Sequence, residues 1–188
     1  MSTSVYTWVP NKIREVPPQY KVLISRAEAQ NEQRRMLAHR GVMSWEFAYD
    51  DAIMTSSNRN SIYDFWVSRK GMYDTFYLPS FKWDGKLSTA YTTGTTLNLS
   101  DTSRFSAVST DRNSSIVIIH PTSGLTDVRT ISSLSSTTLV VNSELSRSYP
   151  IGTEVDICYV ARFADGFQFG LENYFLTTAS IKFTEVLP

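Results

Sequence analysis

The chain has 188 residues, which is enough for one domain or for a compact domain with a small inserted module. Lysine plus arginine equals aspartate plus glutamate, at 18 each, so no global charge draws the protein toward phosphate backbones or anionic membranes, and we expect neither membrane binding nor specific nucleic-acid binding. The single cysteine, Cys158, excludes an internal disulfide framework, fits a reducing compartment, and is interpreted as a small buried core residue.

Alternation of apolar and polar residues predicts two strands in the first third of the chain. A weaker pattern lies in YKVLIS, at residues 20–25, and a stronger one in MSWEFAYD, at residues 43–50. In the second segment Met43, Trp45, Phe47 and Tyr49 share one face, which is typical of a half-buried strand; this set places Trp45 and Phe47 in the core.

The segment between these strands contains AQNEQRRMLA, at residues 29–38. Its residues suit helices by propensity, but we favour an extended arm or strand. Arg34, Arg35 and Arg40 are the best candidates in the chain for a phosphate contact, although acidic neighbours favour an arm that is solvated or contacts another subunit.

One helix is predicted at about residues 57–70. Ser56, Ser57 and Asn58 offer oxygens for its N-cap, and Gly71 follows in the position of a C-terminal cap. The apolar residues Ile62, Phe65 and Trp66 recur at helical spacing, so we expect the helix to lie on a sheet; the next segment, TFYLPS, predicts a short strand that ends at Pro79.

The composition changes between Asp84 and Asp156, where serine and threonine dominate. Short Ile and Val runs recur about every ten residues between turn-like clusters, which predicts a small all-β module inserted in the main domain. The main domain then resumes around a turn at residues 164–166 and closes with a strand in ASIKFTEV, at residues 179–186. We therefore expect a mainly β fold, a β-sandwich of residues 1–83 and 157–188 with one packed helix, carrying a β-rich module at residues 84–156.

Residues with catalytic chemistry do not form a recognisable set. His39 and His120 are far apart and neither has a second ligand at metal spacing, and the adjacent Asp50 and Asp51 are explained by turn chemistry more simply than by a calcium site. No nucleotide-binding, hydrolase or zinc-protease motif occurs, so we expect no enzyme activity, no cofactor and no bound metal.

The segment SIYDFWVSRKGMYDTFYLPSFKW, at residues 61–83, concentrates aromatic side chains. They could form a sugar-stacking surface, but their placement on a helix face and the following strand favours core burial. The N-terminus lacks a basic region followed by an apolar run, and nothing approaches the roughly 20 apolar residues of a membrane span, so we expect a soluble protein made in a cytoplasm.

The order of SWEFAYDD, SIYDFWVSRKG, TFYLPSFKWD and ASIKFTEVLP resembles the minor tail proteins of long-tailed bacteriophages, in particular the distal tail proteins, their relatives in gene transfer agents, and the minor tail protein at the tip of lambda-like tails. In those families a helix ending in an aromatic-x-x-basic-x-Gly step leads into a strand with an F-x-x-P pattern. The matching residues are Phe65, Trp66, Arg69, Gly71, Phe76, Leu78 and Pro79. Apart from Arg69 they form, together with Trp45 and Phe47, the expected structural core of the motif. The inserted stretch resembles another module that recurs in phage proteins.

The resemblance implies a structural virion protein that is assembled in the host cytoplasm and forms a ring, usually a hexamer, at the distal end of the tail. Such a ring joins the tail tube protein to the hub or tail-tip protein, near the tape measure and tail fibre proteins. The alternatives are a carbohydrate-binding module for host-surface glycans, suggested by the aromatic cluster and the Ser/Thr-rich insertion, and, less favoured, a hydrolase of the cell envelope.

Overall fold

The structure, a computed structural model, describes residues 4–8, 14–21, 24–26, 36–38, 42–106, 115–164, 168–171 and 176–186. Within these ranges the chain is mainly β, which confirms the predicted fold class. The strands are β1 (Arg14–Lys21), β2 (Ile24–Arg26), β3 (Met36–Ala38), β4 (Val42–Thr55), β5 (Phe76–Pro79), β6 (Gly85–Lys86), β7 (Thr96–Asn98), β8 (Ser115–Ile119), β9 (Thr126–Leu134), β10 (Thr138–Val141), β11 (Glu154–Phe163), β12 (Gln168–Leu171) and β13 (Leu176–Glu185). The helices are α1 (Ser56–Ser68) and α2 (Ser103–Ser106).

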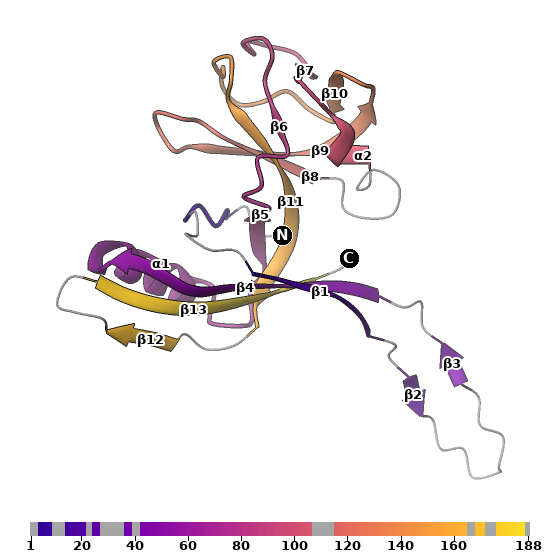
Figure 1. Cartoon of the computed structure of the whole chain (residues 1–188). Coiled ribbons are helices and arrows are strands. Elements are labelled where there is room, and N and C mark those ends of the chain that lie inside the picture. Colours follow the sequence, from indigo (N-terminus) through magenta and orange to yellow (C-terminus); the bar gives the residue numbers. More distant parts are fainter. Residues whose placement is uncertain are drawn as a thin grey trace.

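One part of the molecule, which we call the base, is an antiparallel sheet in the order β1–β4–β13–β11 with α1 packed beside β4 and β13 (Figure 1). β12 pairs with β13, and β5 pairs with the other edge of β11. The N-terminal segment joins β5 in parallel, since Tyr6 N–H donates to Tyr77 O at 2.8 Å. Aromatic rings from these elements meet in one core, in which Tyr6, Phe76 and Phe183 are at most 1% exposed.

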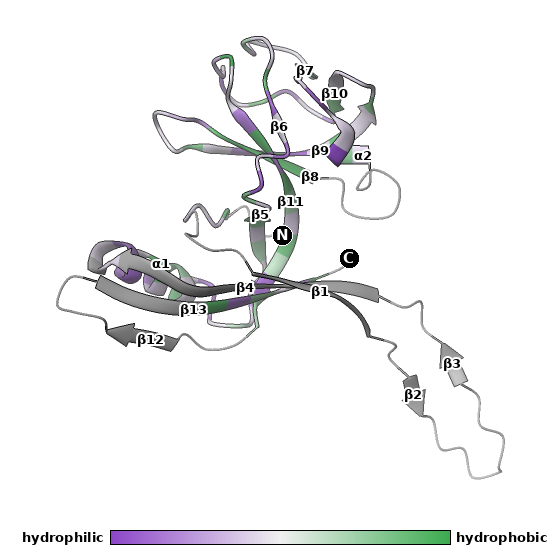
Figure 2. Ribbon diagram, viewed as in Figure 1, coloured by the Kyte–Doolittle hydropathy of each residue, from purple (hydrophilic) through white to green (hydrophobic). Residues whose placement is uncertain are grey.

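The other part, which we call the barrel, is a closed circuit of strands in the order β11–β8–β9–β10–β7–β6. The last step is made where Leu87 bridges Leu99 and Ser88 N–H donates to Asn98 O at 2.9 Å. A second apolar core fills the circuit, and its most buried members include Leu97, Phe105, Ile116, Ile118, Leu139 and Val155. Figure 2 shows the apolar residues that run along β8 and β11.

Strand β11 belongs to both parts. Its odd-numbered residues share one face, as the pleat of a strand requires. Val155 and Ile157 lie in the barrel core, Ala161 and Phe163 lie in the base core, and Tyr159 packs against both. β8 and then β13 pair along one edge of β11, while β6 and then β5 pair along the other. The expected division at residues 84 and 156 stays a prediction, and β11 continues through its second boundary.

Helix α1 starts slightly earlier than the sequence suggests. Its N-cap is Thr55, whose hydroxyl accepts a hydrogen bond from Asn58 N–H at 3.3 Å, so the serines that follow lie inside the helix. The helix is followed by Gly71 at φ +66°, where a Cβ would lie 3.1 Å from the ring of Trp66, so glycine fits both the backbone and the packing. No helix in the described part of the chain is long and apolar enough to cross a membrane.

Truncation of Phe76 to alanine should lower the free energy of unfolding by about 3–5 kcal/mol, because the ring is buried among the other aromatic rings of the base. The control is Tyr63→Ala on α1, where the side chain is 48% exposed and the expected loss is about 1 kcal/mol or less. Urea unfolding of both variants measures the difference. Equal losses would contradict the role of Phe76 in the core.

Candidate functional site

A buried polar cluster lies where the chain passes from the base to the barrel. We call Ser80, Asp84, Arg104 and Asp156 the junction cluster. Ser80 N–H donates to Ile157 O at 2.9 Å, and Ile157 N–H donates to Asp84 Oδ2 at 2.9 Å, so both main-chain groups of one β11 residue bind the segment that follows β5. Asp84 is 7% exposed and Asp156 is 6% exposed. Two carboxylates are therefore held together in a largely dry junction.

The contacts of the two carboxylates overlap at a single hydroxyl. Ser80 Oγ bonds to Asp84 Oδ2 and also lies 3.5 Å from Asp156 Oδ1. Asp84 N–H donates to Asp156 Oδ1 at 3.3 Å. The nearest cation is Arg104, whose Nη1 lies 3.6 Å from Asp84 Oδ1 while more than half of its side chain remains exposed. The positive charge of Arg104 therefore lies beside Asp84, not Asp156, and is partly exposed to solvent.

The backbone between these residues is strained. Phe81 and Trp83 both have φ of +53°, a left-handed conformation that costs a residue other than glycine roughly 1–2 kcal/mol. Phe81 is buried in the base core, whereas Trp83 is 58% exposed. This path aims the successive N–H groups of Trp83 and Asp84 at the Asp156 carboxylate, as in the backbone concavities that bind anions. The Asp156 side chain therefore helps to hold the strained segment from Phe81 to Asp84 in its left-handed path.

Burial and, to a smaller extent, the nearby charge of Asp84 raise the pKa of Asp156 to about 6. Hydrogen bonds from the backbone N–H groups of Asp84 and Trp83 act against this shift. The junction cluster can therefore bind and release a proton at mildly acidic pH. Among the described residues, no group of three or more His, Cys, Asp or Glu side chains is placed to hold a metal ion.

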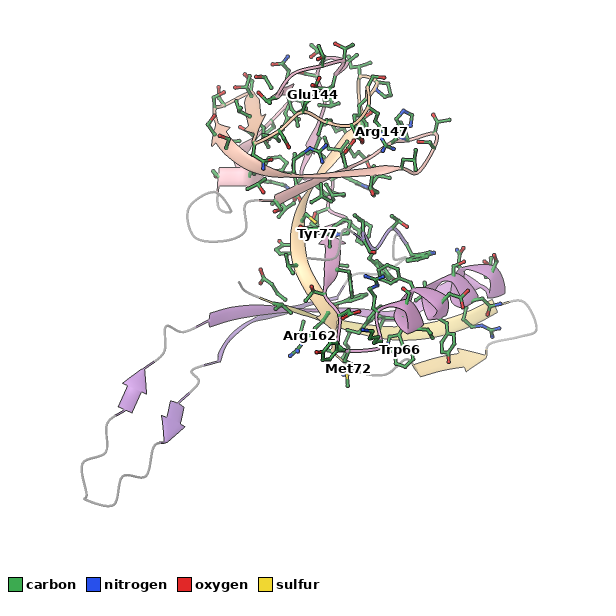
Figure 3. The ribbon with its side chains drawn as sticks, turned by 180° about the vertical axis from the view of Figure 1, so that it is seen from behind. Trp66, Met72, Tyr77, Glu144, Arg147 and Arg162 are labelled. Atoms are coloured by element: carbon green, nitrogen blue, oxygen red, sulfur yellow. The ribbon has the colours of Figure 1, made fainter. Side chains whose placement is uncertain are left out.

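A second polar cluster ties the strands of the barrel together. We call Asp127, Arg129, Ser146, Arg147 and Tyr149 the barrel cluster; Figure 3 shows Arg147 on this part of the molecule. Asp127 Oδ2 accepts hydrogen bonds from Tyr149 Oη and Ser146 Oγ, both at 2.8 Å, and from Ser146 N–H at 3.1 Å. Arg129 Nη2 lies 3.1 Å from the other carboxylate oxygen, and Arg147 Nε lies 3.5 Å from Oδ2.

The electrostatics of Asp127 are opposite to those of Asp156. Burial by itself would raise the pKa of Asp127, but the hydrogen bonds from Tyr149 and Ser146, together with the Arg129 charge, outweigh it and hold the pKa below its ordinary value of 3.8. Burial raises the pKa of Tyr149, and the hydrogen bond to Asp127 adds to that shift. Asp127 therefore stays ionised at neutral pH, and the barrel cluster acts as a fixed tie between β9 and residues 146–149.

The helix-to-strand segment singled out in the sequence divides between core and surface. Phe76, Leu78 and Pro79 are buried, and Phe65 and Trp66 are partly buried against the base core. Among the other aromatic residues, Tyr73 is 79% exposed. Figure 3 shows Trp66 and Met72 on the base, away from the barrel.

The remaining expectations have mixed outcomes. The backbone of Trp45 and Phe47 lies in β4, and their place in the core stays a prediction. Arg34, Arg35, Arg40 and His39 lie outside the described residues.

Three further residues can be placed directly. The turn expected at Asp50 and Asp51 is wrong, because β4 continues through both residues to Thr55; the two aspartates lie where the β4–β13 register shifts, between the paired residues Tyr49 and Ala52. Cys158 is a buried free cysteine on β11, and burial raises the pKa of its thiol. His120 follows β8, and its Nδ1 accepts backbone N–H groups of the next turn at 3.3 Å.

The residues of the two polar clusters did not stand out in the sequence as a site. Asp84 and Asp156 marked only the limits of the inserted module. The usable signal was Asp156 itself, a carboxylate inside the apolar run VDICYV. Its partner Asp84 is 72 positions away, so the pairing depends on how β11 folds back against the segment after β5.

Comparison with protein-family models finds no match for this chain, and comparison with curated proteins also finds none. Function is therefore inferred from the residues and their geometry.

Replacing Asp127 with asparagine should lower the free energy of unfolding at pH 7 by roughly 3 kcal/mol, because donors to a buried charged group lose their partner. Since the pKa of Asp127 is lowered in the folded protein, its contribution is present above about pH 4 and is lost as the pH falls below the ordinary value. The difference between wild type and variant should therefore shrink toward pH 3 in urea titrations. A difference that does not change with pH would contradict the role of the ionised carboxylate.

Proposed function

We propose that the chain is a structural virion protein of a long-tailed bacteriophage, which forms a ring at the distal end of the tail and joins the tail tube to the hub or tip complex. The resemblance of its helix-to-strand segment to distal tail and minor tail proteins supports this proposal. The mainly β fold is compatible with it. The activity is then assembly, and the geometry that matters is the surface offered to neighbouring subunits.

The observation that carries the proposal is the pair β2–β3, which we call the arm. It forms a two-stranded sheet of its own and lies well away from the base, beyond the ends of β1 and β4 (Figure 1). A two-stranded sheet of three residues per strand is marginal in water, because it has no layer on which to bury a face. Contact with a second copy of the chain would supply that layer.

The geometry suits a closed ring. An arm that leaves one subunit and packs on a different surface of the next makes a head-to-tail contact, and such contacts close into rings when the rotation allows it. The arm and the barrel leave the base in different directions (Figure 1), so the barrel does not stand between the arm and a neighbour. In this arrangement the basic residues Arg34, Arg35 and Arg40 belong to the subunit-contacting segment.

The ring assignment also sets the expected neighbours. The base would face the tail tube protein and the hub protein, while the barrel would project outward, toward a fibre protein or a glycan on the host surface. The protein would be assembled in the host cytoplasm and found in the tail of the virion. No enzymatic step is part of this function.

The arm can be removed without opening its supporting hairpin, since Lys21 and Val42 are register partners at the end of the β1–β4 pair. A variant in which Asn-Gly replaces residues 22–41 closes this pair with a two-residue turn. We expect native mass spectrometry to show a closed ring for the wild type and a folded monomer for the variant. As a control, Leu125→Ser changes an exposed apolar residue of the barrel and should leave the ring intact.

Two results would contradict the proposal. If the Asn-Gly variant assembles like the wild type, the arm does not make the contact between subunits. If the wild-type chain stays monomeric, and a labelled antibody does not find it in purified virions, the proposed ring function is wrong.

A further inference from the structure

We propose that Asp84 and Asp156 form a proton-controlled latch between the base and the barrel. With one proton shared by the two carboxyl groups, the segment from Ser80 to Gly85 is held firmly on β11; without that proton, its hold on β11 weakens. The latch belongs to the folded chain itself and does not depend on the assembly function proposed above.

The hydrogen-bond count at Ser80 supports a shared proton. Its hydroxyl oxygen accepts from Lys82 N–H at 3.2 Å, and its single proton can be donated to Asp84 or to Asp156 but not to both. The contact between Ser80 Oγ and the carboxyl oxygen that does not receive this proton is favourable only when that carboxyl group carries a proton of its own. Two charged carboxylates beside one hydroxyl leave a repulsion in a buried site that the backbone N–H donors and Arg104 offset only in part.

The charged groups around the latch do not remove this repulsion. On α2, Arg104 faces Asp84 from a largely exposed position. On β11 itself, Glu154 adds a negative charge that raises the pKa of Asp156, although it also pairs with Lys86 of β6 at 3.8 Å. Cys158 is buried on the same strand and its raised thiol pKa keeps it neutral. The net charge around Asp156 is therefore negative, and a proton on its carboxyl group reduces that negative charge.

Release of the segment has a mechanical consequence. The barrel is connected to the base by β11 and by the Ser80–Gly85 segment, whose bonds to Asp156 and to Ile157 fix its path. That path holds Phe81 and Trp83 in left-handed conformations, which relax when the segment leaves β11. Loss of the proton therefore weakens one of the two connections, so the segment opens more often and the barrel gains freedom to reorient relative to the base.

The test is amide hydrogen exchange of Trp83, Asp84 and Ile157, measured by NMR and corrected for the intrinsic effect of pH. The folded-state pKa of Asp156 is raised, so the closed latch is favoured below its ordinary value and weakens as the pH rises through about 6. Protection of these amides should fall about tenfold between about pH 5 and pH 7, while Leu139 in the barrel core stays protected.

Asp156→Asn places a neutral group of the same shape at the latch, so its protection at Trp83 and Asp84 should not change over this pH range. The matched control is Asp64→Asn, which neutralises an exposed carboxylate on α1 in the base and should keep the wild-type pH dependence.

Three results would overturn the latch: wild-type protection that does not change with pH, an Asp156→Asn variant that loses protection as the wild type does, or an equal loss of protection throughout the barrel core. If Asp156→Asn does not fold, the carboxyl carbon resonances of the wild type decide. The Asp156 carboxyl group must titrate near pH 6, and titration of this group at its ordinary value of 3.8 would refute the latch.

Discussion

The structure depends on the continuity of β11 through both parts of the molecule. Its two edges are occupied along most of its length, by β8 and β13 on one side and by β6 and β5 on the other. Because its side chains alternate, one face of this strand supplies Val155 to the barrel core and Phe163 to the base core. Neither sheet can form without the strand that the other one uses, which couples two cores that are otherwise separate.

That sharing explains why polar residues are buried at the junction. The segment between β5 and β6 runs along one edge of β11, and its main-chain groups leave water as it does so. Ser80 and Asp84 satisfy the main chain of Ile157, and Asp156 satisfies the backbone of this segment. Asp127 in the barrel is supported by neutral donors and two arginines, whereas Asp156 faces a second carboxylate. The same residue type is therefore a permanent tie in one place and a group that responds to pH in the other.

The sequence indicated the local elements well because their signals lie within a few neighbouring residues. The alternation from Met43 to Tyr49 corresponds to β4. Gly71 follows α1 with a positive φ, although Lys70, directly after the C-cap Arg69, also takes a left-handed conformation at φ +52°. The same local reasoning misplaced Asp50 and Asp51, since adjacent aspartates favour turns by composition, and the pairing of β4 with β13 on both sides of them overrides that preference.

By itself, the sequence determined the mainly β class, the single long helix and the short strand that ends at Pro79, because periodicity, capping residues and proline act on the chain locally. Only the tertiary structure decided that the barrel closes between Leu87 and Leu99, that β11 serves both cores, and that Asp84 meets Asp156. These features depend on which distant segments become neighbours. That choice is made by sheet register and by the burial of whole faces, which no short stretch of residues encodes.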